Sequence, residues 1–222
     1  MAENKHANCE FCSFDRMNGS IFPDYMQISE TGCLKHELIY DGKYFVVKPD
    51  ISPIVKGHLL IIPKKHYYSI LSIPSEQLEE IYMLKQKIID YYASQDKHFM
   101  FFEHGCCSEA ETGSSCIHHA HLHAIPIDEK NERQILTNVV SELGFNTKKP
   151  HDLENSVYLY MQTTFSPALF WEDEKLHSQF FRIKLADIFG YIQRARWQNC
   201  IVNEKERLVS ECWLNSIKNL KF

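Results

Sequence analysis

The most constraining feature of this chain is a run of histidines at alternate positions, in which His119, His121 and His123 are separated by Ala120 and Leu122. Side chains of a β-strand alternate between its two faces, so three such imidazoles share one face and the apolar residues point to the other. Burying three polar rings in a row costs free energy that packing alone does not return. The pattern therefore predicts a site on a half-buried strand.

Two kinds of chemistry suit three imidazoles on one face. They could bind a divalent metal, because imidazole is a common metal ligand. They could instead act on phosphorus, with one neutral imidazole attacking and its neighbours holding the phosphoryl oxygens. A solvated histidine-rich face is the simpler third interpretation, and spacing alone does not separate the first two.

Composition limits the class of protein. The 222 residues, 44% of them apolar, allow one large domain or one domain with a substantial extension. The net charge of −5 gives no electrostatic reason to expect nucleic acid or an acidic membrane as partner. We expect a cytoplasmic protein with neither a membrane span nor a signal peptide. The 8 cysteines are unevenly spaced, which favours thiols and metal ligands over disulfides.

The remaining elements follow from hydrophobic periodicity and turn residues. Strand patterns recur at 36–40, 44–48, 57–63, 99–102, 157–163 and 168–171. Helix patterns cover 75–93, 129–144 and 178–192, of which the first is the most amphipathic. Arg182, in the last of these helices, is interpreted as a surface arginine, with a phosphate contact as the alternative.

The histidine run resembles the signature of the histidine triad (HIT) family, in which three histidines alternate with apolar residues, here His119–Ile125. Two upstream stretches, Asp50–Pro53 and Gly57–His66, also resemble the family, in particular its nucleoside phosphoramidase branch. The resemblance covers roughly residues 9–128 and is weak beyond them.

The resemblance implies an α+β, HIT-like fold, with an antiparallel sheet of about five strands and one main amphipathic helix. We place this catalytic domain at residues 1–130 and expect residues 131–222 to form a C-terminal α/β extension that packs on it. Family members commonly form homodimers by continuing the sheet across two subunits, so we expect a homodimer here. The extension could reinforce that pairing or replace it.

The resemblance also implies catalytic roles for the three histidines. His121, the middle one, would attack an α-phosphorus and form a nucleotidyl-imidazole intermediate that water then hydrolyses. His123 would donate a hydrogen bond to a non-bridging oxygen as charge develops there. His119 completes the predicted catalytic set.

A metal site is implied near the N-terminus. Cys9 and Cys12 alone supply only two of the four ligands that zinc needs, so two ordinary thiols are the alternative. In the distantly similar galactose-1-phosphate uridylyltransferases, two histidines complete a tetrahedral zinc site. The matching positions here are His66 and His119, which predicts a closed, structural zinc site, although His66 could simply cap a loop.

Further positions are implied on the substrate side. The carboxylate after the second strand would accept hydrogen bonds from the ribose hydroxyls and its neighbour would pack on the base, although a turn aspartate bonding its own backbone is the alternative. The loop before the histidines would present N–H groups to the phosphate. The chain departs from the phosphoramidase pattern at two positions: Cys116 in this loop stands where serine is usual, and Glu103, directly after the strand 99–102, stands where asparagine is usual. These substrate-binding candidates are Asp50, Ile51, Glu103, Ser114, Ser115 and Cys116.

The predicted function is that of a nucleotide hydrolase that cleaves the bond between a nucleoside monophosphate and a leaving group. That group would be an amine, an aminoacyl group or a second nucleotide. Uridylyltransferase-like relatives carry glutamine in place of the third histidine, so His123 favours water as the acceptor. The alternatives are a nucleotidyltransferase or phosphorylase, and a non-catalytic nucleotide-binding module.

Overall fold

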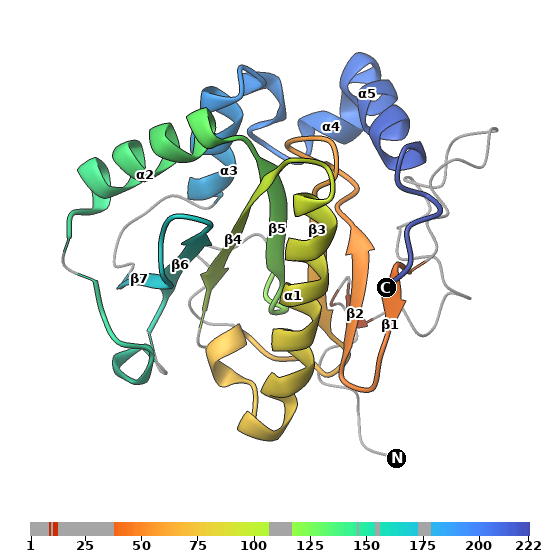
Figure 1. Cartoon of the computed structure of the whole chain (residues 1–222). Helices are drawn as coiled ribbons and strands as arrows, with labels where there is room; N and C mark the ends of the chain where they lie inside the picture. The colour runs from red at the N-terminus through yellow and green to blue at the C-terminus, as the bar shows by residue number, and fades with distance from the viewer. Residues whose placement is uncertain are drawn as a thin grey trace.

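The computed structural model describes residues 9, 11–12, 38–106, 117–145, 147–153, 156–172 and 179–222. In these residues a single seven-stranded sheet carries helices on both faces (Figure 1). The strand order is β1-β2-β3-β5-β4-β6-β7, and every neighbouring pair is antiparallel. The strands are β1 Tyr40–Asp41, β2 Phe45–Pro49, β3 Leu59–Pro63, β4 His98–Gly105, β5 Leu122–Ile127, β6 Tyr158–Thr163 and β7 Leu169–Glu172. The predicted α+β class with an antiparallel sheet is confirmed.

Helix α1 (Leu78–Ala93) covers one face of the sheet. Its buried side chains recur three or four residues apart, as an amphipathic helix requires. They are Ile81, Leu84, Ile88 and Tyr92. The Tyr92 hydroxyl also lies 2.9 Å from the carbonyl oxygens of Gly57 and of Ala124, which ties the end of the helix to the centre of the sheet.

Helices α2 (Glu129–Leu143) and α3 (Phe180–Ile188) pack against the opposite face. The pattern that predicts a helix over 178–192 ends early, because Gly190 adopts a φ of 73° that stops the helix. Two further helices, α4 (Asn199–Val202) and α5 (Glu204–Asn215), complete the C-terminal region and are not predicted from the sequence.

The last two strands continue the sheet rather than form a separate one. Strand β4 pairs with β5 on one side and with β6 on the other, so both of its edges are occupied within the chain. The homodimer and the domain boundary at residue 130 stay predictions.

The histidine run departs from the strand that its alternation predicts. Strand β5 begins at Leu122, so His123 lies in the strand while His119 and His121 precede it. The backbone N–H of Ala120 donates to the carbonyl oxygen of Tyr67 at 2.7 Å, outside the sheet ladder. The three rings therefore do not share one strand face.

A buried arginine anchors the C-terminal helices to the loop between β2 and β3. Arg194 is 1% exposed, and its Nε donates to the carbonyl oxygen of Pro53 at 2.7 Å. Its Nη1 donates to the Glu206 carboxylate at 2.8 Å and its Nη2 to the Ser210 hydroxyl at 2.6 Å. The loop and α5 are thus held by one side chain.

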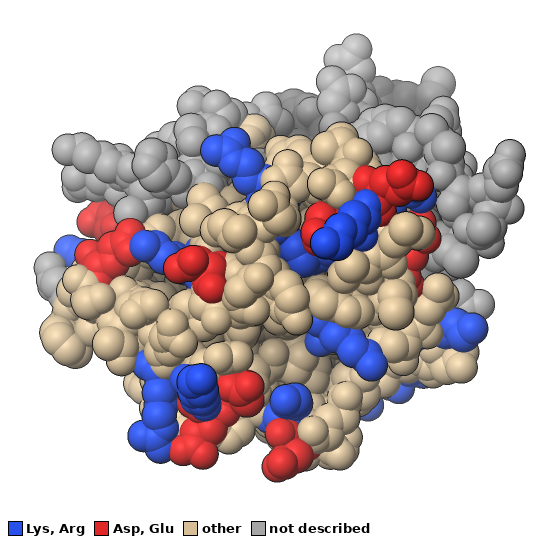
Figure 2. All heavy atoms as spheres, turned by 90° about the horizontal axis from the view of Figure 1, so that it is seen from above, with Lys and Arg blue, Asp and Glu red and all other residues tan. Residues whose placement is uncertain are grey.

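Charge is distributed without one dominant sign on the face seen in Figure 2, where basic and acidic side chains of the described residues are interspersed. Within the described part of the chain, no helix is long and apolar enough to cross a membrane.

One candidate substrate residue, Glu103, lies in the core on the α1 side of the sheet. Its Oε1 accepts the backbone N–H of Ile70 at 2.9 Å, and its Oε2 accepts the Tyr158 hydroxyl. It is 2% exposed, and burial raises its pKa to about 7 despite these two hydrogen bonds. The neighbouring Phe102 points to the opposite face, where it stacks on His123. The structure therefore does not bring Glu103 to the histidines, and its substrate role stays a prediction.

Replacing Arg194 by alanine should lower the free energy of unfolding by about 3 kcal/mol, because it leaves the Glu206 carboxylate without its buried partner. Urea denaturation measures this loss. The matched control is Arg207→Ala, which breaks the partly exposed pair with Glu211 and should change stability by less than about 0.5 kcal/mol. Equal losses from the two variants would contradict the anchoring role.

The raised pKa of Glu103 predicts a pH-dependent stability. The folded protein holds this proton up to about pH 7, while the unfolded chain releases it near its ordinary pKa of about 4.5. Stability should therefore fall as the pH rises through this window, by on the order of 3 kcal/mol. Glu103→Gln should remove that component. Parallel stability curves for the two proteins from pH 4 to 8, measured by urea denaturation, would contradict the assignment.

Candidate functional site

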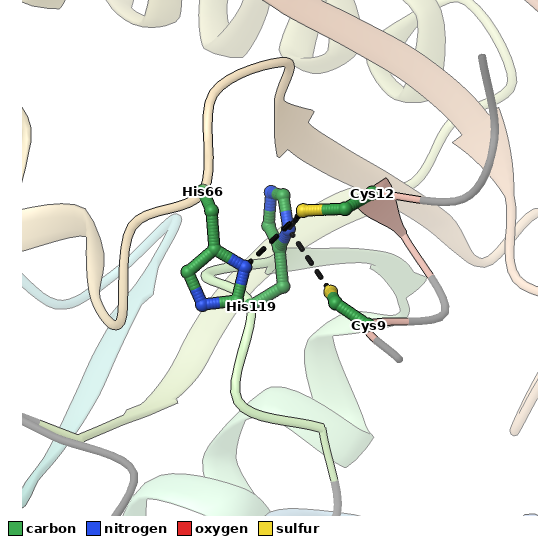
Figure 3. Close-up of side chains that lie close together, drawn as sticks. All are labelled: Cys9, Cys12, His66 and His119. Atoms are coloured by element: carbon green, nitrogen blue, oxygen red, sulfur yellow. Dashed lines mark hydrogen bonds between the residues drawn. The ribbon is translucent and has the colours of Figure 1, made fainter. Parts of the chain in front are cut away.

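Four side chains from three segments of the chain converge beside the histidine run (Figure 3). Cys12 Sγ lies 3.3 Å from Nδ1 of His66 and 3.4 Å from Nδ1 of His119. Cys9 Sγ lies 3.5 Å from the same His119 nitrogen. All four ligand atoms fall within 4.8 Å of one another, so the predicted ligand set is brought together.

The geometry of this cluster suits a metal ion such as zinc. A tetrahedral zinc with bonds of about 2.3 Å to sulfur and about 2.0 Å to nitrogen separates the two donor types by about 3.5 Å, close to the distances observed. His119 Nε2 lies 2.7 Å from the carbonyl oxygen of Pro63, which accepts a hydrogen bond from the Nε2–H. The lone pair of Nδ1 therefore faces the thiols. Both nitrogens of His119 are thus committed, and neither is left for a substrate.

His121 is oriented by the backbone just before it. Its Nδ1 lies 2.7 Å from the carbonyl oxygen of His119, so Nδ1 carries the proton that this bond needs. Burial lowers the pKa of His121 below its usual value, and the neutral ring then carries its lone pair on Nε2. An attacking imidazole needs this protonation state.

His123 receives its orientation from a second histidine. His58 Nδ1 accepts the backbone N–H of Ile54 at 3.2 Å, so the neutral His58 ring carries its proton on Nε2. That nitrogen lies 2.9 Å from His123 Nδ1 and donates to it. Burial lowers the pKa of His58 to about 4 and that of His123 well below its usual value. His123 is therefore neutral, with its own proton on Nε2, and its ring is stacked on Phe102 with centroids 4.4 Å apart.

Asp50 lies behind these two rings and is already hydrogen-bonded inside the protein. Its Oδ1 accepts the backbone N–H of Ser52 at 2.8 Å, as a turn aspartate does, and its Oδ2 accepts Arg182 Nη1 at 3.0 Å. Burial opposes ionisation, but the neighbouring His58 and Arg182 hold the pKa of Asp50 at about 2. The ribose-binding role of Asp50 stays a prediction, as does base packing by the half-buried Ile51.

The interpretation of Arg182 as a surface arginine is wrong, since only 6% of it is exposed. Arg182 directly follows the apolar Phe181 in the sequence, and no sequence signal distinguishes a buried arginine there from a surface one. His58, in contrast, stands in the stretch that resembles the HIT family, and its polar ring in an apolar strand is a signal the sequence carries.

Two further residues line the triad and are not predicted as site residues. Phe11, between the two cysteines, sets its ring edge-on to His119 and His121, with centroids 5.7 and 5.6 Å apart. Lys48 is 4% exposed and places its Nζ 5.2 Å from the centre of the Phe11 ring. Lys48 is in register with Leu60, and Leu60 with His123, so the lysine stands on the face of the sheet where His123 lies.

The predicted phosphate-side positions Ser114, Ser115 and Cys116 lie outside the described residues. Of the other candidates, the described structure brings Asp50 close to His123, with Oδ2 3.9 Å from Nδ1. The described site thus contains a Cys/His cluster that can hold a metal ion and, beside it, two neutral imidazoles with assigned protons.

Comparison with known proteins identifies the family of the chain. Residues 28–139, half of the chain, match the family described as proteins similar to the CwfJ C-terminal. Zinc finger CCCH domain-containing protein 59 of Oryza sativa is 26% identical over 194 residues, which cover 78% of this chain and 30% of that protein. The chain therefore spans less than a third of this relative. Protein hit of Bacillus subtilis is 26% identical over 117 residues, covering 53% of this chain and 77% of that protein.

Solved structures with a similar fold include several histidine triad proteins. A hypothetical histidine triad nucleotide-binding protein from Sulfolobus tokodaii aligns over 96% of this chain and 99% of its own, with 16% identity and a TM-score of 0.36. A hypothetical protein from Leishmania major aligns over 61% and 95%, with 21% identity and a TM-score of 0.41. These likenesses are too loose to carry an argument about the site. The family match and the sheet together identify the chain as a member of the family similar to the CwfJ C-terminal, with the α+β fold of the histidine triad proteins.

Proposed function

We propose that the protein cleaves the bond between a nucleoside monophosphate and a leaving group through a covalent intermediate on His121. The observation that carries this proposal is the hydrogen bond from His121 Nδ1 to the His119 carbonyl oxygen. It fixes the tautomer in which Nε2 is the nucleophile, and burial keeps the ring neutral.

The reaction takes two displacements at phosphorus. His121 Nε2 attacks the α-phosphorus, the nitrogen–phosphorus bond forms, and the leaving group departs with the electron pair of its bond to phosphorus and takes up a proton from solvent. Water then attacks the same phosphorus and gives up one proton to solvent, and the nucleoside monophosphate leaves as the bond to His121 breaks, which returns the neutral ring. In both steps the Nε2–H of His123 donates a hydrogen bond to a non-bridging oxygen, where negative charge develops.

The Cys/His cluster would hold a zinc ion with four protein ligands, Cys9, Cys12, His66 and His119. Such a closed site leaves no position for water or substrate, so the ion's contribution is structural. The cluster holds Cys9 and Cys12, and with them the Phe11 ring, against the catalytic His121. The side chains that act on phosphorus are then independent of the ligand set, except for the shared backbone of His119.

The leaving group and the acceptor define the substrate class. His123 stands where transferases of the wider superfamily carry glutamine, which supports water over phosphate as the acceptor. The candidate substrates are adenosine phosphoramidates, aminoacyl adenylates and dinucleoside polyphosphates.

The proposal predicts that His121→Asn abolishes turnover and leaves metal binding intact. Wild type and variant are incubated with adenosine-5′-phosphoramidates of amines and with diadenosine polyphosphates, and AMP is quantified. Loss of one catalytic nucleophile should lower kcat by at least about 1000-fold. Metal content, read on the same samples, should stay at one zinc per chain in both proteins. Cys12→Ser, the matched metal variant, should lose the zinc.

Each other outcome identifies a rival. Release of ADP when phosphate is added would assign a phosphorylase. Nucleotide binding without turnover, unchanged by the His121 variant, would assign a binding module. Loss of zinc from His121→Asn would make the three histidines a metal site and overturn the mechanism.

A further inference from the structure

The C-terminal region places a charged side chain, that of Arg182, against Asp50, which lies next to His58 and His123. Arg182 belongs to α3, which lies outside the residues that match the family. Its guanidinium reaches the loop after β2, where Nη1 contacts Asp50 Oδ2 at 3.0 Å and Nη2 contacts the Ser52 carbonyl oxygen at 2.6 Å. Arg182 and Asp50 are both more than nine-tenths buried. The pair is therefore a built feature of the interior.

The Nε2–H of His58, next to the Arg182–Asp50 pair, has two hydrogen-bond acceptors within reach. His58 carries one proton on Nε2, because its other nitrogen already accepts the Ile54 N–H. From that nitrogen, His123 Nδ1 is 2.9 Å away and Asp50 Oδ2 is 3.5 Å away. A carboxylate is the stronger acceptor, since charge-assisted hydrogen bonds are about twice as strong as neutral ones. Without a competing contact that restrains the Asp50 carboxylate, the His58 Nε2–H would therefore donate its hydrogen bond to Asp50.

We propose that Arg182 is a positioning residue for the reaction, because it holds the Asp50 carboxylate away from His58 and so directs the His58 proton to His123. The expected change in kcat rests on the proposed function, whereas the expected change in the His123 tautomer rests on the geometry alone. His123, held as an acceptor at Nδ1, keeps its own proton on Nε2 and donates it toward the phosphoryl oxygen.

Loss of the guanidinium would change the proton network in a defined order. The Asp50 carboxylate would still accept the hydrogen bond from the Ser52 N–H and would accept a second one from the Nε2–H of His58. His123 Nδ1 would lose its donor, and the two tautomers of its ring would no longer be distinguished. The fraction of His123 able to donate from Nε2 would fall, and with it the stabilisation of developing charge.

The test compares Arg182→Gln with the double variant Asp50→Asn/Arg182→Gln. The single variant should lower kcat by about 100-fold, the scale of a lost proton donor in catalysis. In the double variant, a neutral amide competes weakly for the His58 proton, so kcat should recover most of this loss. ¹⁵N NMR of the His123 ring should show the Nε2–H tautomer in wild type and in the double variant, and a mixture in Arg182→Gln.

The control is Arg194→Gln, which also removes a buried arginine bonded to the same loop but does not touch Asp50. It should lower stability without changing the His123 tautomer. If Arg182→Gln does not fold, the double variant still decides, because it removes both members of the buried pair. Wild-type kcat and tautomer in Arg182→Gln would overturn the proposal, as would a double variant as slow as the single one or one with a mixed tautomer. Absence of wild-type turnover would contradict the proposed function only, and the NMR comparison would then decide this inference.

Discussion

The site depends on one residue that is held from both sides, His119. Its ring is fixed between the Pro63 carbonyl oxygen and the thiols of Cys9 and Cys12, and its own carbonyl oxygen accepts the Nδ1 proton of His121. The position of the ring and the tautomer of the next histidine are therefore set by the same backbone segment. A metal ion in the Cys/His cluster would stiffen this arrangement without entering the chemistry.

The C-terminal region belongs to the same structure as the triad. Strands β6 and β7 extend the sheet from β4, and helix α3 packs on the face where His123 lies. Arg182 and Arg194 both bond to the loop between β2 and β3, which carries Asp50 and His58. The loop that orients His123 is thus built from one part of the chain and clamped by another, which explains why residues outside the family match bear on the site.

Much of this arrangement was accessible from the sequence, and the exceptions have physical causes. Resemblance to a family identified the four cluster ligands, because each stands in a recognisable stretch. Alternation in the histidine run predicted a shared strand face, but the strand begins only at Leu122, since the backbone before it bonds to Tyr67 instead. The interpretation of Arg182 as a surface arginine is wrong because its burial follows from how α3 docks on the sheet, and helical spacing carries no information about docking.

The central claim is that His121 forms a covalent bond to phosphorus, and trapping that bond tests it most directly. Wild-type protein is mixed with an adenosine phosphoramidate, quenched within milliseconds at alkaline pH, digested and examined by mass spectrometry. The account predicts a peptide that contains His121 and carries the added mass of one AMP, with fragmentation that places it on this ring. Turnover without any adduct, or an adduct on another residue, would contradict the account.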